Sequence, residues 1–500
     1  MASNIINSVL DCAKKHPEKA IIISGDHSCT YNNLVLEISS CAARFQSLGI
    51  KSGDRISLLL GNSIQYVVAY YAAISYGALV VPLNTTAKPI DITNWIAHSG
   101  SKILVVSQKL YKSFSDDCVE SLNVVIVPDS EINSDMYWSS QQVQAVNLGE
   151  LSEQISSDMP ATIMYTSGTT GKPKGVTLTH GNFVHNFNEV IKYLHLTSND
   201  SILNILPFYY SYGNSILHTH LMTAAAIVIE NNFMYPIKAL EKIESRQLTG
   251  FSGVPATFSI LLNRTNLTEH NLSSLRYATQ AGGAMPPSNI QRFIDQVDNV
   301  ELFIMYGQTE ATARLTYLEP SKLTTKLGSI GKPLGGVTIE IRGEEGNLVD
   351  RGVEGELYVK GPNIMQGYWN NCELTNQVIV DGYLKTGDLG HIDSEGYIYL
   401  TGRRSDMIKV GGNRISPLEI EEVVSQLDGI EEVAATGVDD EILGQVVKIA
   451  VVVNDGCHIT ELAIKSYCKK NLALYKIPKF VSFVESLPKT ASGKVKRFLL

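Results

Sequence analysis

Residues 165–176 read YTSGTTGKPKGV, and the fold class of the chain follows from this stretch. It holds two Ser/Thr pairs, three glycines and two lysines, after an apolar run at 161–164. A backbone this rich in glycine can fold around an oxyanion with its N–H groups and hydroxyls pointing inward, and Lys172 and Lys174 add positive charge. The stretch therefore predicts a loop that holds a triphosphate.

Two other interpretations of this loop have to be weighed. A Walker A loop requires GxxxxGK[ST], in which the last hydroxyl reaches a magnesium ion. Here Gly168 and Gly171 are too close together, and Pro173 stands where the Ser or Thr should be, so a Walker-type NTPase is disfavoured. A solvated Gly/Ser/Thr loop stays open for the stretch taken alone.

Read whole, the loop resembles the phosphate loop of the adenylate-forming superfamily. That superfamily covers acyl- and aryl-coenzyme A synthetases, peptide-synthetase adenylation domains and firefly-type luciferases. The resemblance implies ATP and Mg²⁺ as ligands and a pantetheine thiol, on coenzyme A or on the phosphopantetheine arm of a carrier protein, as acceptor. The loop residues that it implies for ATP binding are Thr166, Ser167, Gly168, Thr169, Thr170, Gly171 and Lys174.

A glycine pair follows an apolar stretch at residues 280–285, QAGGAM. Glycines at this point would let a flat ring lie against the backbone. Taken alone, the motif also fits a simple turn at the end of a strand. The resemblance places Gly282, Gly283 and Ala284 around the adenine.

Residues 303–311, FIMYGQTEA, predict a strand that breaks at Gly307 into polar residues. A carboxylate beside a triphosphate makes sense where a magnesium ion lies between the two. The resemblance implies that Tyr306 covers the adenine, that Thr309 contacts the α-phosphate and that Glu310 holds the metal.

Two further motifs suit a nucleotide. Residues 383–390, YLKTGDLG, are expected to place Asp388 after a turn, where its carboxylate can accept hydrogen bonds from both ribose hydroxyls. A simple turn aspartate is the alternative. Residues 399–406, YLTGRRSD, supply Arg403, which by resemblance reaches the ribose and phosphate, and a guanidinium suits those oxygens.

Residues 488–497, PKTASGKVKR, lie close to the end of the sequence. Lysines at such a place are usually solvated charge. This spacing, however, resembles the C-terminal catalytic loop of the superfamily, with Lys494 as its catalytic lysine. The ammonium would bridge the substrate carboxylate and the α-phosphate and so neutralise two anions brought together. Five motifs in the order of the superfamily make the chain a member of it.

The resemblance implies a reaction in two steps. A carboxylate oxygen attacks the α-phosphorus of ATP and gives an acyl-adenylate and pyrophosphate. The C-terminal domain then rotates, Lys494 leaves, and a pantetheine thiol in a tunnel lined by Gly411 and Gly412 attacks the acyl carbon and releases AMP. The expected hinge is Ser405, where relatives usually carry Asp or Lys; Ser also permits the backbone change.

The acid pocket is the least determined part. Residues 206–213, LPFYYSYG, match the segment that gates it, and Tyr210 stands where the superfamily usually has His. Neither the Asp typical of α-amino acid enzymes nor the Asn of aryl-acid enzymes occurs at Tyr209 or Tyr210, which weakly disfavours an α-amino acid. A small to medium, largely apolar acid is expected. The other expected walls are Phe251, Gly253, Ala281 and Gly307.

Composition sets outer bounds on function. The chain has 500 residues, 44% hydrophobic and 18% charged, with a net charge of −9, which argues against a general nucleic-acid binder. Its seven cysteines show no CxxC spacing and predict free thiols in a reducing compartment, with no metal cluster. No secretory signal is recognised, and the longest apolar run, residues 67–82, is shorter than the about 20 residues of a membrane span. A cytoplasmic protein without a membrane span is expected.

Alternating strand and helix patterns predict an α/β fold with doubly wound, mostly parallel sheets. The polar segment 129–158, with Trp138, is expected to be a surface excursion, and residues 337–361 a small β-rich subdomain. A separate αβ pattern beyond residue 402 predicts a second domain. The expected units are an adenylation domain, 1–402, and a mobile α+β lid with the catalytic lysine, 403–500.

Several alternatives stay open. The interval between Tyr306 and Asp388 leaves no room for the extra segment that marks fatty acyl-AMP ligases, so thioester formation is expected. Coenzyme A and a carrier protein are not separated as acceptors. A luciferase-like oxygenase would share the motifs, whereas a non-catalytic nucleotide-binding homologue would normally have lost Lys494 or Glu310.

Overall fold

The computed structural model describes residues 4–113, 122–134, 136–141, 144–166, 173–297, 299–411, 413–454, 456–490 and 494–500. Five residues of the predicted phosphate loop and one of the predicted thiol tunnel lie outside these ranges: Ser167, Gly168, Thr169, Thr170, Gly171 and Gly412.

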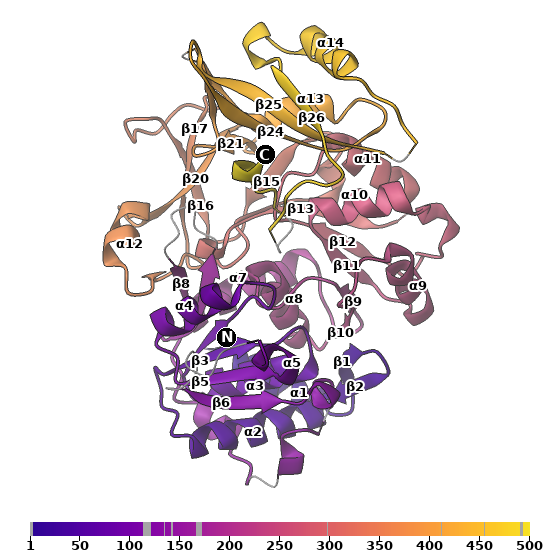
Figure 1. Ribbon diagram of the computed structural model, residues 1–500. Helices are drawn as coiled ribbons and strands as arrows, with labels where there is room; N and C mark the ends of the chain where they lie inside the picture. Colours follow the sequence, from indigo (N-terminus) through magenta and orange to yellow (C-terminus); the bar gives the residue numbers. More distant parts are fainter. Residues whose placement is uncertain are drawn as a thin grey trace.

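A seven-stranded sheet, in the order β18-β8-β7-β4-β3-β5-β6, forms the lower part of the molecule in Figure 1. Its five strands from β7 to β6 are parallel, and β8 and β18 extend it with antiparallel pairings. The strands are β3 (Arg55–Leu59), β4 (Leu79–Pro82), β5 (Ile103–Ser107), β6 (Asn123–Val127), β7 (Pro160–Thr166), β8 (Lys174–Thr179) and β18 (Gly367–Tyr368).

A fourteen-stranded sheet runs from the middle of the molecule into its upper half. Six of its strands form a parallel half: β1 (Ala20–Ser24), β9 (Ser201–Asn204), β10 (Ala226–Ile229), β11 (Gly250–Gly253), β12 (Tyr277–Gln280) and β13 (Glu301–Tyr306). The others pair antiparallel: β2 (His27–Thr30), β14 (Thr316–Leu318), β15 (Ser329–Pro333), β16 (Thr338–Arg342), β17 (Gly355–Lys360), β19 (Ile379–Val380), β20 (Tyr383–Ile392) and β21 (Ile398–Arg403).

The chain beyond residue 403 forms a five-stranded sheet and its own apolar core (yellow and orange in Figure 1). Its elements are β22 (Ile408–Val410), β23 (Asn413–Ile415), β24 (Ile430–Asp440), β25 (Gly444–Val453) and β26 (Phe480–Phe483), with α13 (Pro417–Val424) and α14 (Glu461–Asn471).

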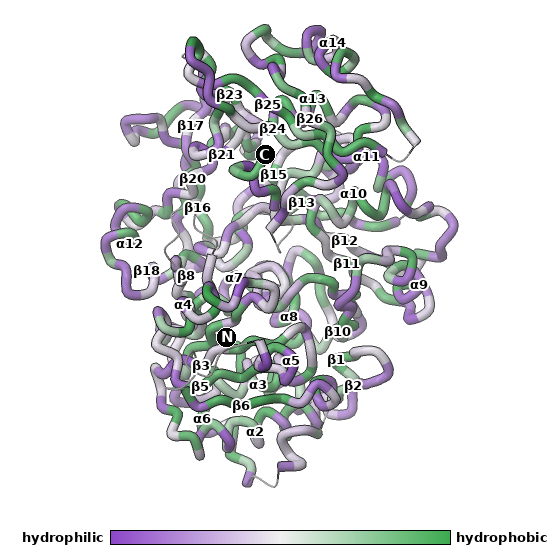
Figure 2. The backbone as a smooth tube through the Cα atoms, viewed as in Figure 1, coloured by the Kyte–Doolittle hydropathy of each residue, from purple (hydrophilic) through white to green (hydrophobic). Residues whose placement is uncertain are grey.

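Successive side chains of a strand point to opposite faces of its sheet, so the two large sheets pack against three separate apolar cores. Leu58 faces the central core while its neighbour Leu59 faces a core that α4 covers, and Ile202 and Leu203 divide in the same way between the central core and the α9–α11 side. Parallel strands buried on both faces explain the continuous apolar runs of the sequence, and Figure 2 shows these strands green inside purple outer turns.

Helices lie on both sides of each large sheet, which confirms the predicted α/β architecture. Every residue of α3 is buried, as its largely apolar sequence requires. The helices outside the C-terminal unit are α1 (Ile5–Lys15), α2 (Tyr31–Ser47), α3 (Ile64–Ser75), α4 (Pro89–Ser99), α5 (Gln108–Tyr111), α6 (Leu148–Ser152), α7 (His180–Tyr193), α8 (Ser211–Leu221), α9 (Pro236–Arg246), α10 (Pro255–Arg264), α11 (Pro287–Gln296) and α12 (Cys372–Val378).

Most described residues of the predicted surface excursion at 129–158 are exposed or half-buried, but Trp138 is not a surface residue. Trp138 is only 1% exposed and packs edge-on against Phe45. The buried carboxylate of Glu37 accepts hydrogen bonds from the backbone N–H groups of Trp138 (2.6 Å) and Ser139 (2.7 Å). The polar composition of the segment gives no sign of these hydrogen bonds, because Glu37 lies about a hundred residues away in the sequence.

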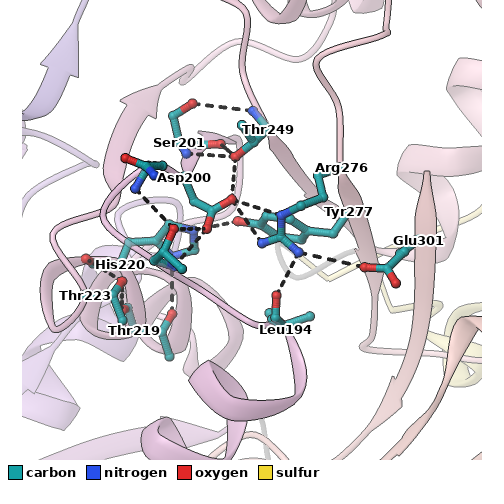
Figure 3. Close-up of polar contacts among 12 residues, drawn as sticks. Leu194, Asp200, Ser201, Thr219, His220, Thr223, Thr249, Arg276, Tyr277 and Glu301 are labelled. Atoms are coloured by element: carbon teal, nitrogen blue, oxygen red, sulfur yellow. Dashed lines mark hydrogen bonds and ion pairs between the residues drawn. The ribbon is translucent and has the colours of Figure 1, made fainter. Parts of the chain in front are cut away.

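The amino ends of the parallel strands carry a polar network (Figure 3). Asp200, just before β9, accepts hydrogen bonds from Arg276 Nε (3.1 Å) and Nη2 (3.0 Å), and from Thr249 Oγ1 (3.0 Å). Arg276 precedes β12 and also donates to the carbonyl of Leu194 (2.9 Å). The network ties together the starts of β9, β11 and β12, and it leaves the opposite strand ends free for a site.

Among the described residues, no helix is both long and apolar enough to cross a membrane. The six cysteines in this part of the chain form no disulfide.

Candidate active site

The predicted adenine residues follow the carboxyl end of β12, the edge where ligands bind in open α/β sheets. Gln280 is the last residue of this strand, and its Nε2 donates to the carbonyl of Gly283 (2.9 Å) across the turn. Gly282 has a φ of 92°, which L side chains rarely adopt, so the turn requires glycine there. Tyr306 ends the neighbouring strand, β13, at the same edge.

Tyr306, Asp388 and Arg403 form one hydrogen-bonded group. The Tyr306 hydroxyl donates to Asp388 Oδ2 (2.5 Å), and Arg403 Nε donates to Oδ1 of the same carboxylate (2.8 Å). Burial raises the pKa of Tyr306 well above its usual value, and the charge of Asp388 raises it further. The phenol is therefore a permanent donor to a carboxylate that is only 4% exposed.

The expectation that Asp388 follows a turn was wrong: it lies within β20, opposite Arg403 on β21. Gly387 has a φ of 75°, and the pairing with β21 shifts register between Leu389 and Gly390. This irregularity in the strand takes the place of the predicted turn.

Glu310 lies in the short 3₁₀ turn Thr309–Ala311 after β13. Its Oε1 accepts a hydrogen bond from the hydroxyl of Tyr368 (2.9 Å), a residue of the edge strand β18. Thr309 Oγ1 is 3.4 Å from Ser211 Oγ at the start of α8.

The surroundings of Glu310 fit a magnesium ion that is shared with phosphates. Among the described residues, neither an ion pair nor a hydrogen bond is found at Oε2, and no group of three or more His, Cys, Asp and Glu could hold a metal unaided. Mg²⁺ commonly binds through one or two carboxylates together with substrate phosphates and water. One oriented carboxylate is what such a site needs from the protein.

Lys494 joins this cluster from the C-terminal unit. Burial and the positive charge of Arg403 lower the pKa of Lys494, while the carboxylates of Asp388 and Glu310 raise it. Lys494 remains exposed to solvent. The charge of the Lys494 ammonium therefore interacts with the charges of Asp388 and Glu310, the two carboxylates predicted to bind the nucleotide and its metal.

The hairpin that carries the phosphate-loop motif is described only at its flanks. Thr166 of β7 pairs with Lys174 of β8, where the hairpin enters the undescribed segment. Tyr165 stacks on Trp95, with 5.7 Å between ring centroids, and its hydroxyl hydrogen-bonds His98 Nδ1 (2.8 Å). These contacts fix the base of the hairpin against α4.

The predicted acid-pocket residues divide into two groups. Tyr210 stands immediately before α8, and its hydroxyl accepts a hydrogen bond from Asn84 Nδ2 (3.2 Å). Phe251, by contrast, is 2% exposed and its ring packs against Phe233 and Phe258 in the core on the α9–α11 side. Its surface is already covered by the protein, so packing alone accounts for this residue.

Two of the pocket glycines have packing reasons of their own. A Cβ on Gly307 would lie 2.0 Å from the carbonyl oxygen of Ala313, and one on Gly253 would lie 2.8 Å from Thr257. Ala281 is buried directly after β12.

The predicted hinge and thiol residues lie apart from the nucleotide cluster in their described contacts. Ser405 is exposed in the turn after β21, and its hydroxyl donates to Asp406 Oδ1 (2.8 Å). Gly411 has a φ of 54° between β22 and β23, and its N–H donates to the carbonyl of Leu443 (2.9 Å).

Sequence reasoning missed the residues that orient the predicted ones. Tyr368, Asn84 and Ser211 each contact a predicted site residue from a distant part of the chain. No local motif marks them. Tyr368 can reach Glu310 because β18 pairs with β8.

Comparison with known proteins identifies the family over most of the chain. A family profile described as AMP-binding enzyme matches residues 10–369, and one described as AMP-binding enzyme C-terminal domain matches residues 419–494. The 2-succinylbenzoate–CoA ligase of Bacillus licheniformis is 33% identical over 497 residues, which cover 98% of each protein.

Solved structures with the same fold carry the ligands that the motifs imply. The anthranilate CoA ligase AuaEII, in complex with anthranoyl-AMP, has a TM-score of 0.91 at 25% identity and covers 99% of this chain and 96% of its own. The o-succinylbenzoate coenzyme A synthetase of Bacillus subtilis, in complex with ATP and a magnesium ion, has a TM-score of 0.84 at 30% identity over 99% of each chain.

The site and these matches agree on one chemistry. The protein is an AMP-forming ligase that activates a carboxylic acid as its acyl-adenylate with ATP and passes the acyl group to a thiol. The chain belongs to the AMP-binding enzyme family of the adenylate-forming superfamily.

Proposed function

We propose that the cluster around Asp388 is the adenylation centre of this ligase, with Lys494 as its catalytic residue. The observation that carries the proposal is the hydrogen-bonded group of Tyr306, Asp388 and Arg403, because the charges of Asp388, Arg403 and Glu310 all act on Lys494. Two carboxylates whose charges act on one lysine, one of them bonded to an arginine, suit a nucleotide whose ribose, phosphates and metal need different partners.

The nucleotide contacts follow from the donors and acceptors present. The carboxylate of Asp388 binds the ribose hydroxyls, Arg403 binds ribose and phosphate, and the ring of Tyr306 covers the adenine. The turn Gly282–Gly283–Ala284 lies along the base. Thr166, Lys174 and the motif between them, Ser167 to Gly171, hold the outer phosphates.

Glu310 is the metal ligand, and Thr309 contacts the α-phosphate. Tyr368 orients the Glu310 carboxylate, which would hold the ion, by donating to Oε1. Magnesium bound there would supply positive charge between the phosphate oxygens.

Lys494 acts on the bond-forming atoms. When the acid oxygen attacks the α-phosphorus, two anions meet, and an ammonium aimed at both lowers the cost of their approach. Pyrophosphate leaves, and the acyl-adenylate remains. A thiol then attacks the acyl carbon, loses its proton and displaces AMP.

The second step calls for a movement of the C-terminal unit. We infer a boundary between an adenylation domain, 1–402, and a lid, 403–500, with Ser405 in the hinge turn and Gly411 and Gly412 along the thiol path. The separate core beyond residue 403 supports this division.

The acid is inferred to be small to medium and largely apolar. Tyr210, held by Asn84, stands at the pocket entrance, with Gly253, Ala281 and Gly307 beside it. Coenzyme A is the proposed acceptor rather than the phosphopantetheine of an acyl carrier protein, because the relatives are named as coenzyme A ligases. The unpaired cysteines support a cytoplasmic location.

ATP–pyrophosphate exchange across a panel of carboxylic acids tests the proposal. Exchange that depends on one class of acid and falls about 10²- to 10³-fold in Lys494→Ala supports it. The matched control is Lys470→Ala, an exposed lysine of α14, which keeps its activity. Acid-dependent exchange that survives in Lys494→Ala contradicts the role of the lysine, and absence of exchange with every acid contradicts the function.

A further inference from the structure

Arg497 extends from the 3₁₀ turn Arg497–Leu499 into the core of the C-terminal unit, three positions after Lys494. Its Nη2 donates to Glu421 Oε2 (3.0 Å), and its Nη1 donates to Glu421 Oε1 and to the carbonyl of Ala435 (2.8 Å). Glu421 Oε1 also accepts from the N–H of Ala435 (2.6 Å). The guanidinium thus closes a polar ring between α13 and β24.

The same guanidinium reaches the hinge turn. Arg497 Nε lies 3.7 Å from Asp406 Oδ2. Asp406 follows Ser405, and its N–H donates to the carbonyl of Arg403 (3.0 Å). Arg497 therefore contacts the turn that follows Arg403, and Arg403 binds Asp388 in the nucleotide cluster.

The described part of the catalytic loop is held by bonds within itself and by contacts with the domain. The Thr490 N–H donates to the carbonyl of Lys494 (2.7 Å), the Lys494 N–H donates to Thr490 Oγ1 (3.0 Å), and the Lys496 N–H donates to the carbonyl of Pro488 (2.7 Å). Lys489, which donates to Glu432 of β24, and Val495, which packs on the apolar cluster around Leu487, attach the loop to the domain. Arg497 adds an attachment directly after the loop that also contacts the hinge turn at Asp406.

A contribution to stability does not by itself explain the ion pair between Arg497 and Glu421. Burial raises the pKa of Glu421, and the attraction of Arg497 only partly offsets that rise. Replacing a buried ion pair by apolar side chains of similar volume is often neutral or stabilising, because both charges lose their hydration. A bidentate guanidinium–carboxylate pair does, however, fix the relative orientation of its two side chains, which an apolar contact does not.

We propose that Arg497 is a positioning residue for adenylation: by bridging Glu421 and the hinge turn at Asp406, it holds Lys494 where the acid and the α-phosphate react. This inference rests on the proposed function of Lys494. It assigns Arg497 a role in the first half-reaction only, because the lysine leaves the site before the thiol attacks.

The test compares the two half-reactions in the full-length protein. Pyrophosphate exchange with the acid found by the panel reports adenylation, and thioester formation from the synthetic acyl-adenylate of that acid and coenzyme A reports the second step. In Arg497→Met, the kcat of exchange falls about 10²-fold, since a displacement of about 1 Å can cost that much. Thioester formation and the KM for ATP change little. Arg497→Lys, which keeps the charge but loses the bidentate contact, recovers exchange in part.

A double variant separates positioning from folding. Arg497→Met with Glu421→Leu replaces the ion pair by an apolar contact, so its melting temperature returns to that of the wild type while exchange stays low. Lys479→Met, which removes a surface pair with Asp440 (2.7 Å), is the matched control and keeps both half-reactions.

Two results overturn the inference: equal loss of both half-reactions in Arg497→Lys, or recovery of exchange together with stability in the double variant. Either one would reduce Arg497 to a structural residue. A wild-type protein without exchange on any acid contradicts the proposed function instead, so the two failures are distinguishable.

Discussion

The hydroxyl of Tyr306 donates a 2.5 Å hydrogen bond to Asp388, a contact that joins the end of a parallel strand to the middle of an antiparallel one. The bond therefore links the parallel half of the large sheet to its antiparallel half, in addition to the pairing of β13 with β14. It sets the direction of the carboxylate before any nucleotide arrives.

Removing this hydroxyl weakens nucleotide binding. In Tyr306→Phe, Asp388 loses its donor, and a hydrogen bond to a charged group is worth about 1.5–3 kcal/mol. We expect the KM for ATP in pyrophosphate exchange to rise about tenfold while the KM for the acid stays unchanged. Tyr397→Phe is the control, since the Tyr397 hydroxyl donates to Glu319 (3.0 Å) and belongs to no proposed nucleotide contact. Equal effects of the two variants would argue against the assignment of Asp388.

Magnesium dependence tests the contact between Tyr368 and Glu310. Tyr368→Phe leaves the carboxylate free to turn, so the magnesium concentration that gives half-maximal exchange should rise a few-fold, and Glu310→Gln should raise it further because the ligand loses its charge. Stripping magnesium with a chelator should abolish exchange in all variants. Tyr383→Phe breaks a similar bond to Glu340 (2.6 Å) elsewhere and should leave the titration unchanged. An unshifted titration in Glu310→Gln contradicts the metal assignment.

The network at the opposite strand ends should govern stability without affecting catalysis. Burial alone would raise the pKa of Asp200, but hydrogen bonds from Thr197 and Arg276 outweigh it and lower the pKa. The stabilisation is therefore present above the unfolded pKa of about 3.9 and is lost as the pH falls through the lower folded value. Asp200→Asn should lower the melting temperature at pH 7 by a few degrees, with a smaller difference near pH 3. Glu301→Gln, at the exposed edge of the same network, should change little.

Three buried histidines predict acid sensitivity. Burial lowers the pKa of His180 to about 4, of His218 to about 3 and of His220 to about 4. The unfolded chain binds these protons near pH 6.5, so stability is full above that pH and falls as the pH drops toward 4. Each pKa unit corresponds to about 1.4 kcal/mol, an upper bound for groups that can rehydrate on partial opening.

His180 is the histidine with which to test this dependence, because neither of its ring nitrogens has a hydrogen-bond partner among the described residues. His180→Leu should flatten the fall of melting temperature between pH 6.5 and 4.5, measured by circular dichroism. The exposed His458, replaced by Gln, should leave the slope unchanged. A slope in His180→Leu as steep as in the wild type contradicts the burial argument for this residue.

The sequence by itself determined the superfamily, the α/β class and the expected roles of residues that stand in contiguous motifs. Lys494, Glu310 and Asp388 could be named because each motif is local, with glycine, hydroxyl and charge at fixed spacing. The strand predicted to break at Gly307 was also confirmed, as β13, since an apolar pattern is a local property. The buried Trp138 was misjudged because its partners are remote.

Only the tertiary structure decided which side chains orient those residues. Tyr368 reaches Glu310 across 58 positions, Arg497 reaches Glu421 across 76, and Asn84 reaches Tyr210 across 126. Such contacts depend on which strands pair and how the C-terminal unit closes on the sheet, and no local pattern encodes them. The chemistry therefore follows from short motifs, while its geometry follows from long-range packing.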